Sequence, residues 1–318
     1  MRSIRSLAVA VATLFALACT SADAHPLATE SAFLQVEDDV RIFYQRFGTG
    51  TPTIFVPMRV GMVYALEPLL GSFDMVFWDP RGFGLSDRPD DLSRYGLDAE
   101  LSDAEALRHH FGADGITYVG ISLWGAVAML YAARHPEAVE RVVAMGPLPV
   151  QAAQMGPPDR PIDHGLEAER VELAAMEADG RMASDPYAYC VLEAYVGGST
   201  SHVDIEAMRI PAKGNGCQYP NDRPDRVLPV VFDGIIGSFG DWDWGDQIAS
   251  VTQPTILLFG DHEAWPQAGV QAYAPLLQDV GWLEVERSGH AVWNDANELM
   301  LEMLDTFFRG AWPDGVNR

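Results

Sequence analysis

The sequence at residues 118–125 is YVGISLWG, at the junction between a short apolar run and a run of helical composition. A serine in a sharp turn between a strand and a helix presents its hydroxyl clear of the sheet edge, and the N–H of the next residue points toward a developing oxyanion. So tight a turn leaves room for only a small residue two positions before the serine, and Gly120 meets this need. The stretch therefore predicts Ser122 as a nucleophile and the N–H of Leu123 as an oxyanion donor. Trp124 stands where such a turn usually has its second glycine, so an ordinary helix cap remains the alternative for the motif taken alone.

Short apolar strands alternate with helical stretches over most of the chain. Strands are expected at 33–36, 41–46, 53–56, 75–78, 116–119, 141–145, 255–259 and 282–286, and helices at 97–111, 123–133, 267–277 and 298–308. Such strands joined by helices favour a parallel sheet that is covered on both faces. Residues 148–245 interrupt this α/β pattern, because they are rich in Pro, Gly, Asp and Met and hold helical runs at 171–176 and 187–196. We therefore expect a core formed by residues 25–147 and 246–318, with an inserted helical segment between them.

Acidic residues and a histidine follow the last two predicted strands. Asp261 and Glu263 come directly after the seventh strand, and His290 comes shortly after the eighth. The loops at the carboxyl ends of parallel strands lie at one edge of the sheet, so these residues can converge on Ser122. There His290 would accept the Ser122 proton, and a carboxylate would hold the imidazole. The order of serine, acid and histidine along the chain predicts a catalytic triad.

Residues 77–87, FWDPRGFGLSD, resemble the Asp-x-Arg-Gly-x-Gly-x-Ser turn of α/β hydrolases. Together with Ser122, the late acid and His290, this resemblance extends over nearly the whole chain after its first residues. In detail the sequence is similar to the proline iminopeptidase-like branch of exported serine hydrolases, whose members often have a helical cap and then a tryptophan-rich segment such as Asp241–Trp244. The resemblance implies the α/β-hydrolase fold, with a mostly parallel sheet, helices on both faces and a helical cap at 148–245.

The resemblance also bears on the acid and on the oxyanion hole. The family places its acid at the end of a Gly-x-x-Asp motif, which corresponds to Glu263; Asp261 remains the alternative acid, because a glutamate is about one methylene longer. After the third strand the family usually has His-Gly, whereas this chain has Pro57-Met58-Arg59. The second oxyanion N–H therefore maps to Arg59 or Met58. The Arg59 side chain could meet a substrate carboxylate or form an ordinary salt bridge.

Composition and the remaining motifs exclude several classes of function. The formal net charge of −24 disfavours nucleic acids and anionic lipid surfaces as partners. The sequence has no glycine-rich phosphate loop and no Cys-x-x-Cys motif, and His109 and His110 are adjacent rather than at helical ligand spacing, so we expect no metal and no cofactor. In the family the turn with Asp79 and Arg81 braces the loops beneath the site, so both are expected to be structural. A serine rather than an aspartate at position 122 argues against haloalkane dehalogenase and epoxide hydrolase chemistry.

Residues 1–24 have the pattern of a secretory signal peptide. A basic start precedes a run of apolar and small residues at 7–18, and Ala22-Asp23-Ala24 then offers small residues at the positions that signal peptidase reads. The run is too short for a spanning helix of roughly 20 apolar residues, and no later run is long enough, so we expect no stable membrane insertion. We expect a mature chain that begins near His25 and is periplasmic or secreted. A lipoprotein anchored through Cys19 is the alternative.

Two cysteines follow the predicted signal, Cys190 and Cys217. An even pair in an exported chain predicts a disulfide. Two free buried thiols are the alternative.

Together these residues predict an exported serine hydrolase that cleaves an ester or amide through an acyl-enzyme on Ser122. A small ester or lactone is the preferred substrate, and the alternative is a proline iminopeptidase-like aminopeptidase acting on short peptides. A non-catalytic binding protein of the same fold is the alternative from another class. Cap carboxylates that could anchor a peptide amine are Glu193, Asp204, Glu206, Asp222 and Asp225. Tryptophans that could line an acyl pocket or pack the core are Trp124, Trp242, Trp244 and Trp265.

Overall fold

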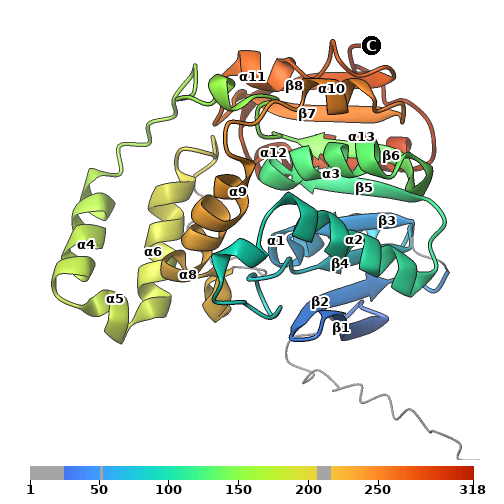
Figure 1. Cartoon of the computed structure of the whole chain (residues 1–318). Coiled ribbons are helices and arrows are strands. Elements are labelled where there is room, and N and C mark those ends of the chain that lie inside the picture. The colour runs from blue at the N-terminus through green and yellow to red at the C-terminus, as the bar shows by residue number, and fades with distance from the viewer. Residues whose placement is uncertain (1–24, 51–52, 206–215) are drawn as a thin grey trace, which may run out of the picture.

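The computed structural model describes residues 25–50, 53–205 and 216–318 (Figure 1). The predicted signal peptide with Cys19, and the candidate carboxylate Glu206, lie outside the described residues. Figure 1 shows a sheet flanked by helices, with helices α4, α5 and α6 forming a lobe to one side of it.

The described residues form an eight-stranded sheet in the order β1-β2-β4-β3-β5-β6-β7-β8. Its strands are β1 (Glu30–Glu37), β2 (Val40–Phe47), β3 (Ile54–Pro57), β4 (Met75–Trp78), β5 (Ile116–Ile121), β6 (Val139–Met145), β7 (Thr255–His262) and β8 (Val280–Gly289). Strand β2 pairs antiparallel with β1 and β4, and the pairs from β4 to β8 are parallel. All of the predicted strands are present. Strands β7 and β8 run further than predicted and reach the candidate site residues.

Helices cover both faces of the sheet. Those of the core are α1 (Arg59–Ala65), α2 (Leu97–Phe111), α3 (Ser122–Arg134), α10 (Gly245–Ala249), α11 (Gln267–Gln271), α12 (Val292–Asp295) and α13 (Asn297–Phe308). One buried cluster packs α2, α3 and α10 against the sheet through Leu107, Met129 and Ile248. A second cluster packs α1 and α13 through Met62 and Leu304. The predicted mostly parallel sheet with helices on both faces is confirmed.

The helix predicted at 267–277 is shorter in the structure. Helix α11 ends at Gln271, and turns follow it. Pro275 lacks a backbone N–H and disfavours helical geometry at the residue before it, which explains the early end. The error therefore lies in extending an apolar helical pattern across a proline.

The region inserted between β6 and α10 is mainly helical in its described part. Its elements are η4 (Ala152–Gln154), α4 (Glu167–Ala178), α5 (Arg181–Ser184), α6 (Pro186–Gly198), η5 (Gly216–Gln218), η6 (Pro220–Asp222), α8 (Pro224–Leu228), the π-helix η7 (Pro229–Ile236) and α9 (Gly237–Phe239). The two helical runs predicted here lie within α4 and α6. Helix α6 starts as its sequence favours, because the Asp185 carboxylate accepts the N–H of Ala188 at 3.1 Å and Pro186 occupies the first position.

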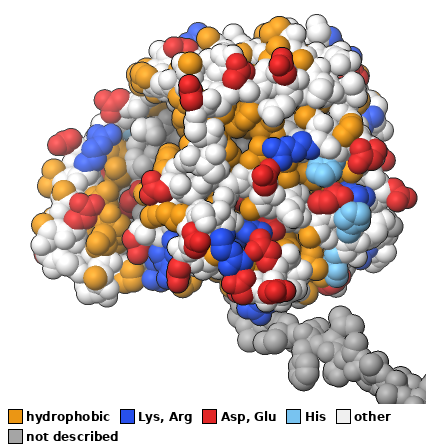
Figure 2. Space-filling model, viewed as in Figure 1, with side chains coloured by type: hydrophobic (Ala, Val, Ile, Leu, Met, Phe, Trp, Pro, Cys, Tyr) orange, Lys and Arg blue, Asp and Glu red, His pale blue; other side chains and the backbone are white. Residues whose placement is uncertain are grey.

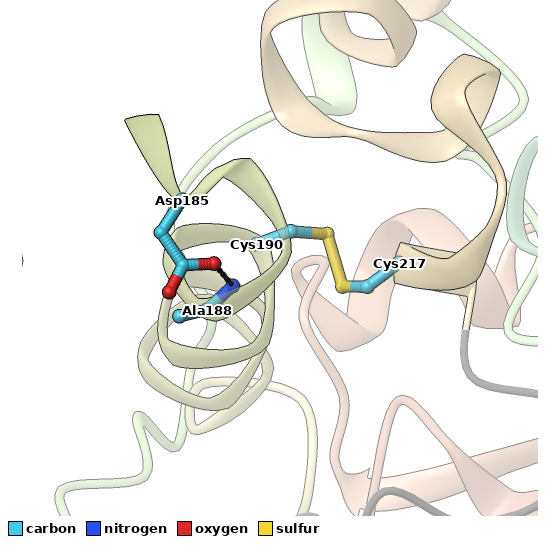
Figure 3. Close-up of a disulfide and its surroundings, with 4 residues drawn as sticks. All are labelled: Asp185, Ala188, Cys190 and Cys217. Atoms are coloured by element: carbon cyan, nitrogen blue, oxygen red, sulfur yellow. Dashed lines mark hydrogen bonds between the residues drawn. A yellow bond between two sulfur atoms is a disulfide. The ribbon is translucent and has the colours of Figure 1, made fainter. Parts of the chain in front are cut away.

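The predicted disulfide is present between Cys190 in α6 and Cys217 in η5 (Figure 3). It joins the lobe of α4, α5 and α6 to the segment at η5 and η6. That segment contacts the core, because Asn221 Nδ2 donates to the backbone oxygens of Gly84 and Ser86 at 3.2 and 2.9 Å. The disulfide therefore links the outer helices to a part of the insertion that is fixed on the core.

The surface is acidic, as the sequence requires. Acidic side chains are spread over the face seen in Figure 2, in keeping with 45 Asp and Glu against 21 Lys and Arg. Among the described residues, no helix is both long enough and apolar enough to span a bilayer.

The disulfide generates a prediction about stability. Replacing both Cys190 and Cys217 by alanine should lower the free energy of unfolding by about 3–4 kcal/mol, because the unfolded chain regains the entropy of a loop of 27 residues' separation. Urea unfolding of the oxidised protein and the double variant measures this difference. The double variant should match the reduced native chain, and equal midpoints for oxidised and reduced native protein would contradict the prediction.

Candidate active site

Ser122 occupies a strained turn at the carboxyl end of β5. Its φ is +51°, a left-handed conformation that costs a residue with a side chain on the order of 1–3 kcal/mol and is concentrated at functional sites. The turn is tight, since a Cβ placed on Gly120 would lie 2.0 Å from the backbone oxygen of Trp124. Leu123 is the second residue of α3, where backbone N–H groups have no acceptor within the helix. A tight turn of this kind between a strand and a helix is what the sequence predicts at Ser122.

His290 and Glu263 form a buried hydrogen-bonded pair. His290 Nδ1 is bonded to Glu263 Oε1, which also accepts the N–H of Ala264 at 2.7 Å. Glu263 is 2% exposed, and His290 is also buried. Because a carboxylate only accepts hydrogen bonds, the Nδ1 atom carries the proton and leaves Nε2 free to act as a base.

Gly146 brings the histidine–acid pair next to the serine turn. Strands β5 and β6 are neighbours with Ile121 opposite Met145, so Ser122 and Gly146 leave the sheet at the same level. A Cβ on Gly146 would lie 2.8 Å from His290 Nδ1 and 2.9 Å from Glu263 Oε2. The structure thus gathers the three predicted triad residues at one edge of the sheet. Sequence reasoning did not single out Gly146, although a Gly-Pro pair directly after a strand was an available signal.

Asp261, the alternative acid, is directed elsewhere. Its Oδ1 lies 2.9 Å from His262 Nδ1 and accepts the N–H of Ser288 at 3.1 Å. Partial burial acts to raise its pKa, but the hydrogen bonds from His262 and from the Ser288 N–H outweigh burial and leave the pKa below its ordinary value. Arg160 also pairs with Asp261, with Nη1 3.6 Å from the carboxylate oxygen Oδ2. The geometry therefore favours Glu263 as the partner of His290.

The Arg59 side chain forms a buried salt bridge. Its guanidinium donates to both oxygens of Asp79 at 3.0 and 2.8 Å, and it stacks on the rings of Phe43 and Tyr219 at 4.9 and 5.3 Å. Burial acts against the charge, but the Asp79 carboxylate raises the pKa of Arg59 above its ordinary value. With 5% exposure, this side chain is unsuited to meeting a substrate carboxylate. Of the two interpretations, the ordinary salt bridge is the one that the structure shows.

The backbone at Met58 and Arg59 forms the turn that follows β3. Met58 has a φ of +62° and is followed by the first residue of α1. Strand β3 is paired with β5, with Phe55 opposite Tyr118, so the turn after β3 emerges beside the Ser122 turn. Either N–H named from the sequence remains a candidate donor at this junction.

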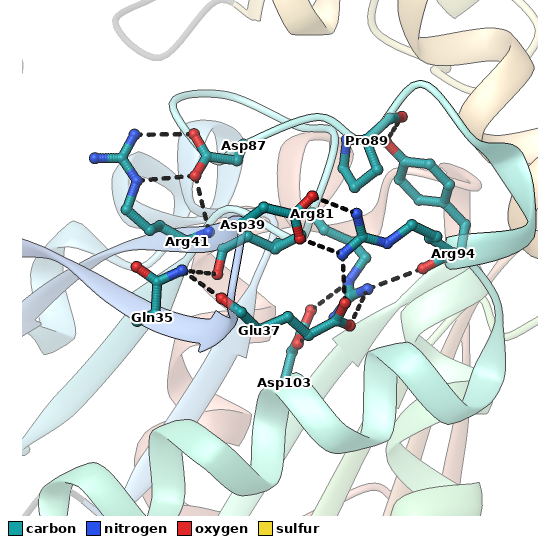
Figure 4. Close-up of polar contacts among 11 residues, drawn as sticks. Gln35, Glu37, Asp39, Arg41, Arg81, Asp87, Pro89, Arg94 and Asp103 are labelled. Carbon is teal, nitrogen blue, oxygen red and sulfur yellow. Dashed lines mark hydrogen bonds and ion pairs between the residues drawn. The ribbon is translucent and has the colours of Figure 1, made fainter.

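Asp79 and Arg81 join several segments of the chain through hydrogen bonds and ion pairs, and Figure 4 shows those of Arg81. Arg81 donates to both oxygens of Asp103 at 2.8 and 2.7 Å and pairs with Glu37 at 2.7 Å. Asp79 accepts the N–H of Leu85 at 2.9 Å in addition to its bonds from Arg59. These contacts are structural, as expected from the sequence.

The candidate tryptophans have different surroundings. The Trp124 indole is buried, and its N–H donates to Glu100 at 2.8 Å. Burial of Glu100 and, to a smaller extent, the negative charge of Asp103 raise the pKa of Glu100 to about 8. Trp242 and Trp244 stack on each other with ring centroids 5.3 Å apart. Only Trp265 of the four has a described ring contact with His290, edge-on at 5.8 Å. Packing thus accounts for three of the four, and Trp265 borders the site.

The cap carboxylates also separate into classes. Asp222 accepts the N–H of Gly84 at 2.7 Å, so it attaches the inserted region to the core. Burial raises the pKa of Asp222 to about 7. Burial also raises the pKa of Glu193 in α6, and Asp225 is exposed.

Comparisons with known proteins agree with the fold. A family described as "alpha/beta hydrolase fold" matches residues 50–176. A proline iminopeptidase of Saccharolobus solfataricus is 25% identical over 244 residues, which cover 74% of this chain and 77% of the relative. A proline iminopeptidase of Heyndrickxia coagulans is 22% identical over 84% of this chain and 94% of its own length. The solved structure of an N-acyl homoserine lactone degrading enzyme has a TM-score of 0.63 and 20% identity, and covers 85% of this chain and 98% of its own.

The chain is a member of the α/β-hydrolase superfamily. Proline iminopeptidases are its distant homologues over most of its length.

The two acidic candidates generate opposite predictions. Glu263→Gln should lower kcat for a p-nitrophenyl ester by about 10³- to 10⁴-fold, because an amide cannot hold the Nδ1–H tautomer of His290 as a carboxylate does. Asp261→Asn is the matched control and should change kcat less than about threefold. Steady-state kinetics of both purified variants measures the effect. A loss confined to Asp261→Asn would transfer the role to Asp261.

Asp222 generates a prediction about pH. Between its ordinary pKa of 3.8 and about 7, the folded chain holds a proton on Asp222 that the unfolded chain has released. The free energy of unfolding should therefore fall as pH rises through this window. Asp222→Asn should flatten that slope, and the exposed Asp225→Asn should leave it unchanged. Urea midpoints at several pH values between 4 and 8 decide this, and an unaltered slope in Asp222→Asn would refute it.

Proposed function

We propose that this chain is a serine hydrolase in which Ser122, His290 and Glu263 act as a catalytic triad on an ester or amide. The observation that carries the proposal is Ser122 in a left-handed turn at the end of β5, level with Gly146 of the neighbouring strand end, against which the buried His290–Glu263 pair packs. Retention of all three side chains in this arrangement argues against a non-catalytic binding protein.

The reaction proceeds through an acyl-enzyme. His290 Nε2 takes the Ser122 proton as the hydroxyl attacks the carbonyl carbon, and the Glu263 carboxylate stabilises the resulting imidazolium. The Leu123 N–H and a second N–H at Met58 or Arg59 hold the oxyanion. His290 then protonates the leaving group, and water activated by the same imidazole releases the acid. Burial of Glu263 keeps its charge poorly screened, which strengthens its effect on His290.

We further propose a small ester or lactone as the substrate. An apolar ring, Trp265, meets His290 edge-on at 5.8 Å and offers an apolar contact to an acyl or alkyl group beside the base. The likeness in fold to a lactone-degrading enzyme supports this substrate class without requiring it.

Aminopeptidase activity is the second candidate function. It is favoured by the proline iminopeptidases that match most of the chain, and by a half-buried carboxylate, Glu193, on helix α6 of the inserted region. Partial burial disfavours the charged form of Glu193, and the positive charge of a bound ammonium group would stabilise that form.

Export of the chain is part of the proposal. The pattern of residues 1–24 supports it, and so does the Cys190–Cys217 disulfide, since such bonds persist in oxidising compartments.

A fluorophosphonate probe tests the enzyme. The native protein should be labelled on Ser122, and Ser122→Ala should lose labelling together with about 10³-fold or more of its ester hydrolysis. Gel fluorescence and initial rates measure the two effects. Equal labelling of the native protein and Ser122→Ala would end the proposal.

A substrate screen separates the two candidate activities. Short-chain p-nitrophenyl esters and simple lactones should be hydrolysed with kcat/KM at least tenfold above those for prolyl and alanyl p-nitroanilides. Ser122→Ala is the blank for every substrate. Preference for the p-nitroanilides would establish the aminopeptidase instead.

A further inference from the structure

A buried carboxylate outside the triad binds both sides of a junction next to His290. Asp295 ends helix α12, and its side chain is 1% exposed. It accepts the N–H of Gly289 at 2.7 Å, which is the residue directly before His290. It also accepts the N–H groups of Val203 and Asp204, at 2.9 and 3.2 Å, from the inserted region. One side chain thus joins the histidine loop to the cap.

The same cap segment touches the other flank of His290. The backbone oxygen of Ser201 accepts the N–H of Ala291 at 3.0 Å. A Cβ on Gly289 would lie 2.3 Å from that oxygen, so the two chains are packed as closely as backbones allow. The residues before and after His290 are therefore both tied to the contact between residues 201–204 and the loop at β8.

His202 completes the contact without neutralising Asp295. Its Nδ1 has no hydrogen-bond partner and lies 3.9 Å from Asp295 Oδ1. Burial lowers the pKa of His202, and repulsion from His290 and His164 lowers it further. The attraction of Asp295 acts in the opposite direction but is outweighed, so the pKa lies below its ordinary value. The nearby Asp204 acts in the same direction as Asp295. A neutral His202 leaves the backbone N–H groups as the main stabilisation of the Asp295 charge.

We propose that Asp295 is a positioning residue that couples the cap segment Ser201–Asp204 to the orientation of His290. This inference rests on the proposed function, because it assigns Asp295 a role in the reaction of Ser122 and His290. It acts through the peptide at Gly289 rather than by contact with substrate. The cap thereby contributes to the geometry of the base as well as to the substrate site.

The test compares Asp295→Ala, Asp295→Asn and the control Asp305→Asn. Asp305 is a surface residue on α13 that pairs with Arg309 at 2.8 Å, so its variant removes the same charge without touching the cap. Turnover of a p-nitrophenyl ester is divided by the number of sites that a fluorophosphonate titrates at completion. This division removes any loss due to unfolded protein.

Asp295→Ala should lower kcat per titrated site by about 10- to 100-fold, the effect of a misplaced catalytic group, and should change KM less than about threefold. Asp295→Asn should be intermediate, since an amide oxygen in the place of Oδ2 keeps the bonds from Gly289 and Val203, while the NH₂ group then faces the N–H of Asp204. The Asp305→Asn control should match the native protein.

Unchanged kcat per titrated site in both Asp295 variants would overturn the inference and leave Asp295 with a role in stability alone. Since Asp295→Asn preserves the shape of the side chain, it gives the decisive value if Asp295→Ala does not fold. Ser122→Ala is measured in parallel. Activity that survives in Ser122→Ala would overturn the proposed function itself, so the two failures are distinguishable.

Discussion

The close approach allowed by Gly146 is the constraint on which the site depends. Strand β6 lies between β5, which ends directly before Ser122, and β7, which ends directly before Glu263. Any side chain at position 146 would occupy the space of the His290 ring and the Glu263 carboxylate. The left-handed backbone at this glycine, with a φ of +51°, is one that other residues rarely adopt. The sheet edge can therefore gather serine, histidine and acid only because one strand ends without a side chain.

The inserted region contacts the core at several places, and two of them adjoin the candidate site. At one, Asp295 and the backbone of Ala291 bind residues 201–204. At the other, Asn221 and Asp222 bind the turn at Gly84 and Ser86. The second place is continuous with the Asp79–Arg59 salt bridge, since Arg59 stacks on Tyr219. The disulfide extends this attachment to α6, so the outer lobe is connected to both the core and the site.

Much of the fold could be predicted from the sequence, because strands and helices depend largely on the residue types within each short segment. Apolar runs gave the strands, and Asp185 and Pro186 mark the start of α6 in the usual way. The helix that begins at Gln267 is shorter than predicted, because the apolar pattern continues past Pro275 but the proline prevents the helix from doing so. The sequence pattern also does not predict the full extent of β7 and β8. Their last residues are polar or glycine and give no apolar strand signal, and they count as strand because β7 and β8 pair with each other.

The site was predictable in its residue types and less so in its contacts. The order of Ser122, acid and His290 along the chain named the partners, but Asp261 and Glu263 stand two positions apart and local pattern treats them alike. Only the three-dimensional arrangement shows that Asp261 faces His262 while Glu263 faces His290. Asp295 had no sequence signal, because its partners are backbone N–H groups, which any residue type supplies, and two of the three lie some ninety positions away. Mass spectrometry of peptides from protein quenched in acid during turnover of a p-nitrophenyl ester tests the central claim most directly. The account predicts an acyl mass on the peptide that contains Ser122, and an acyl mass on a different residue would contradict it.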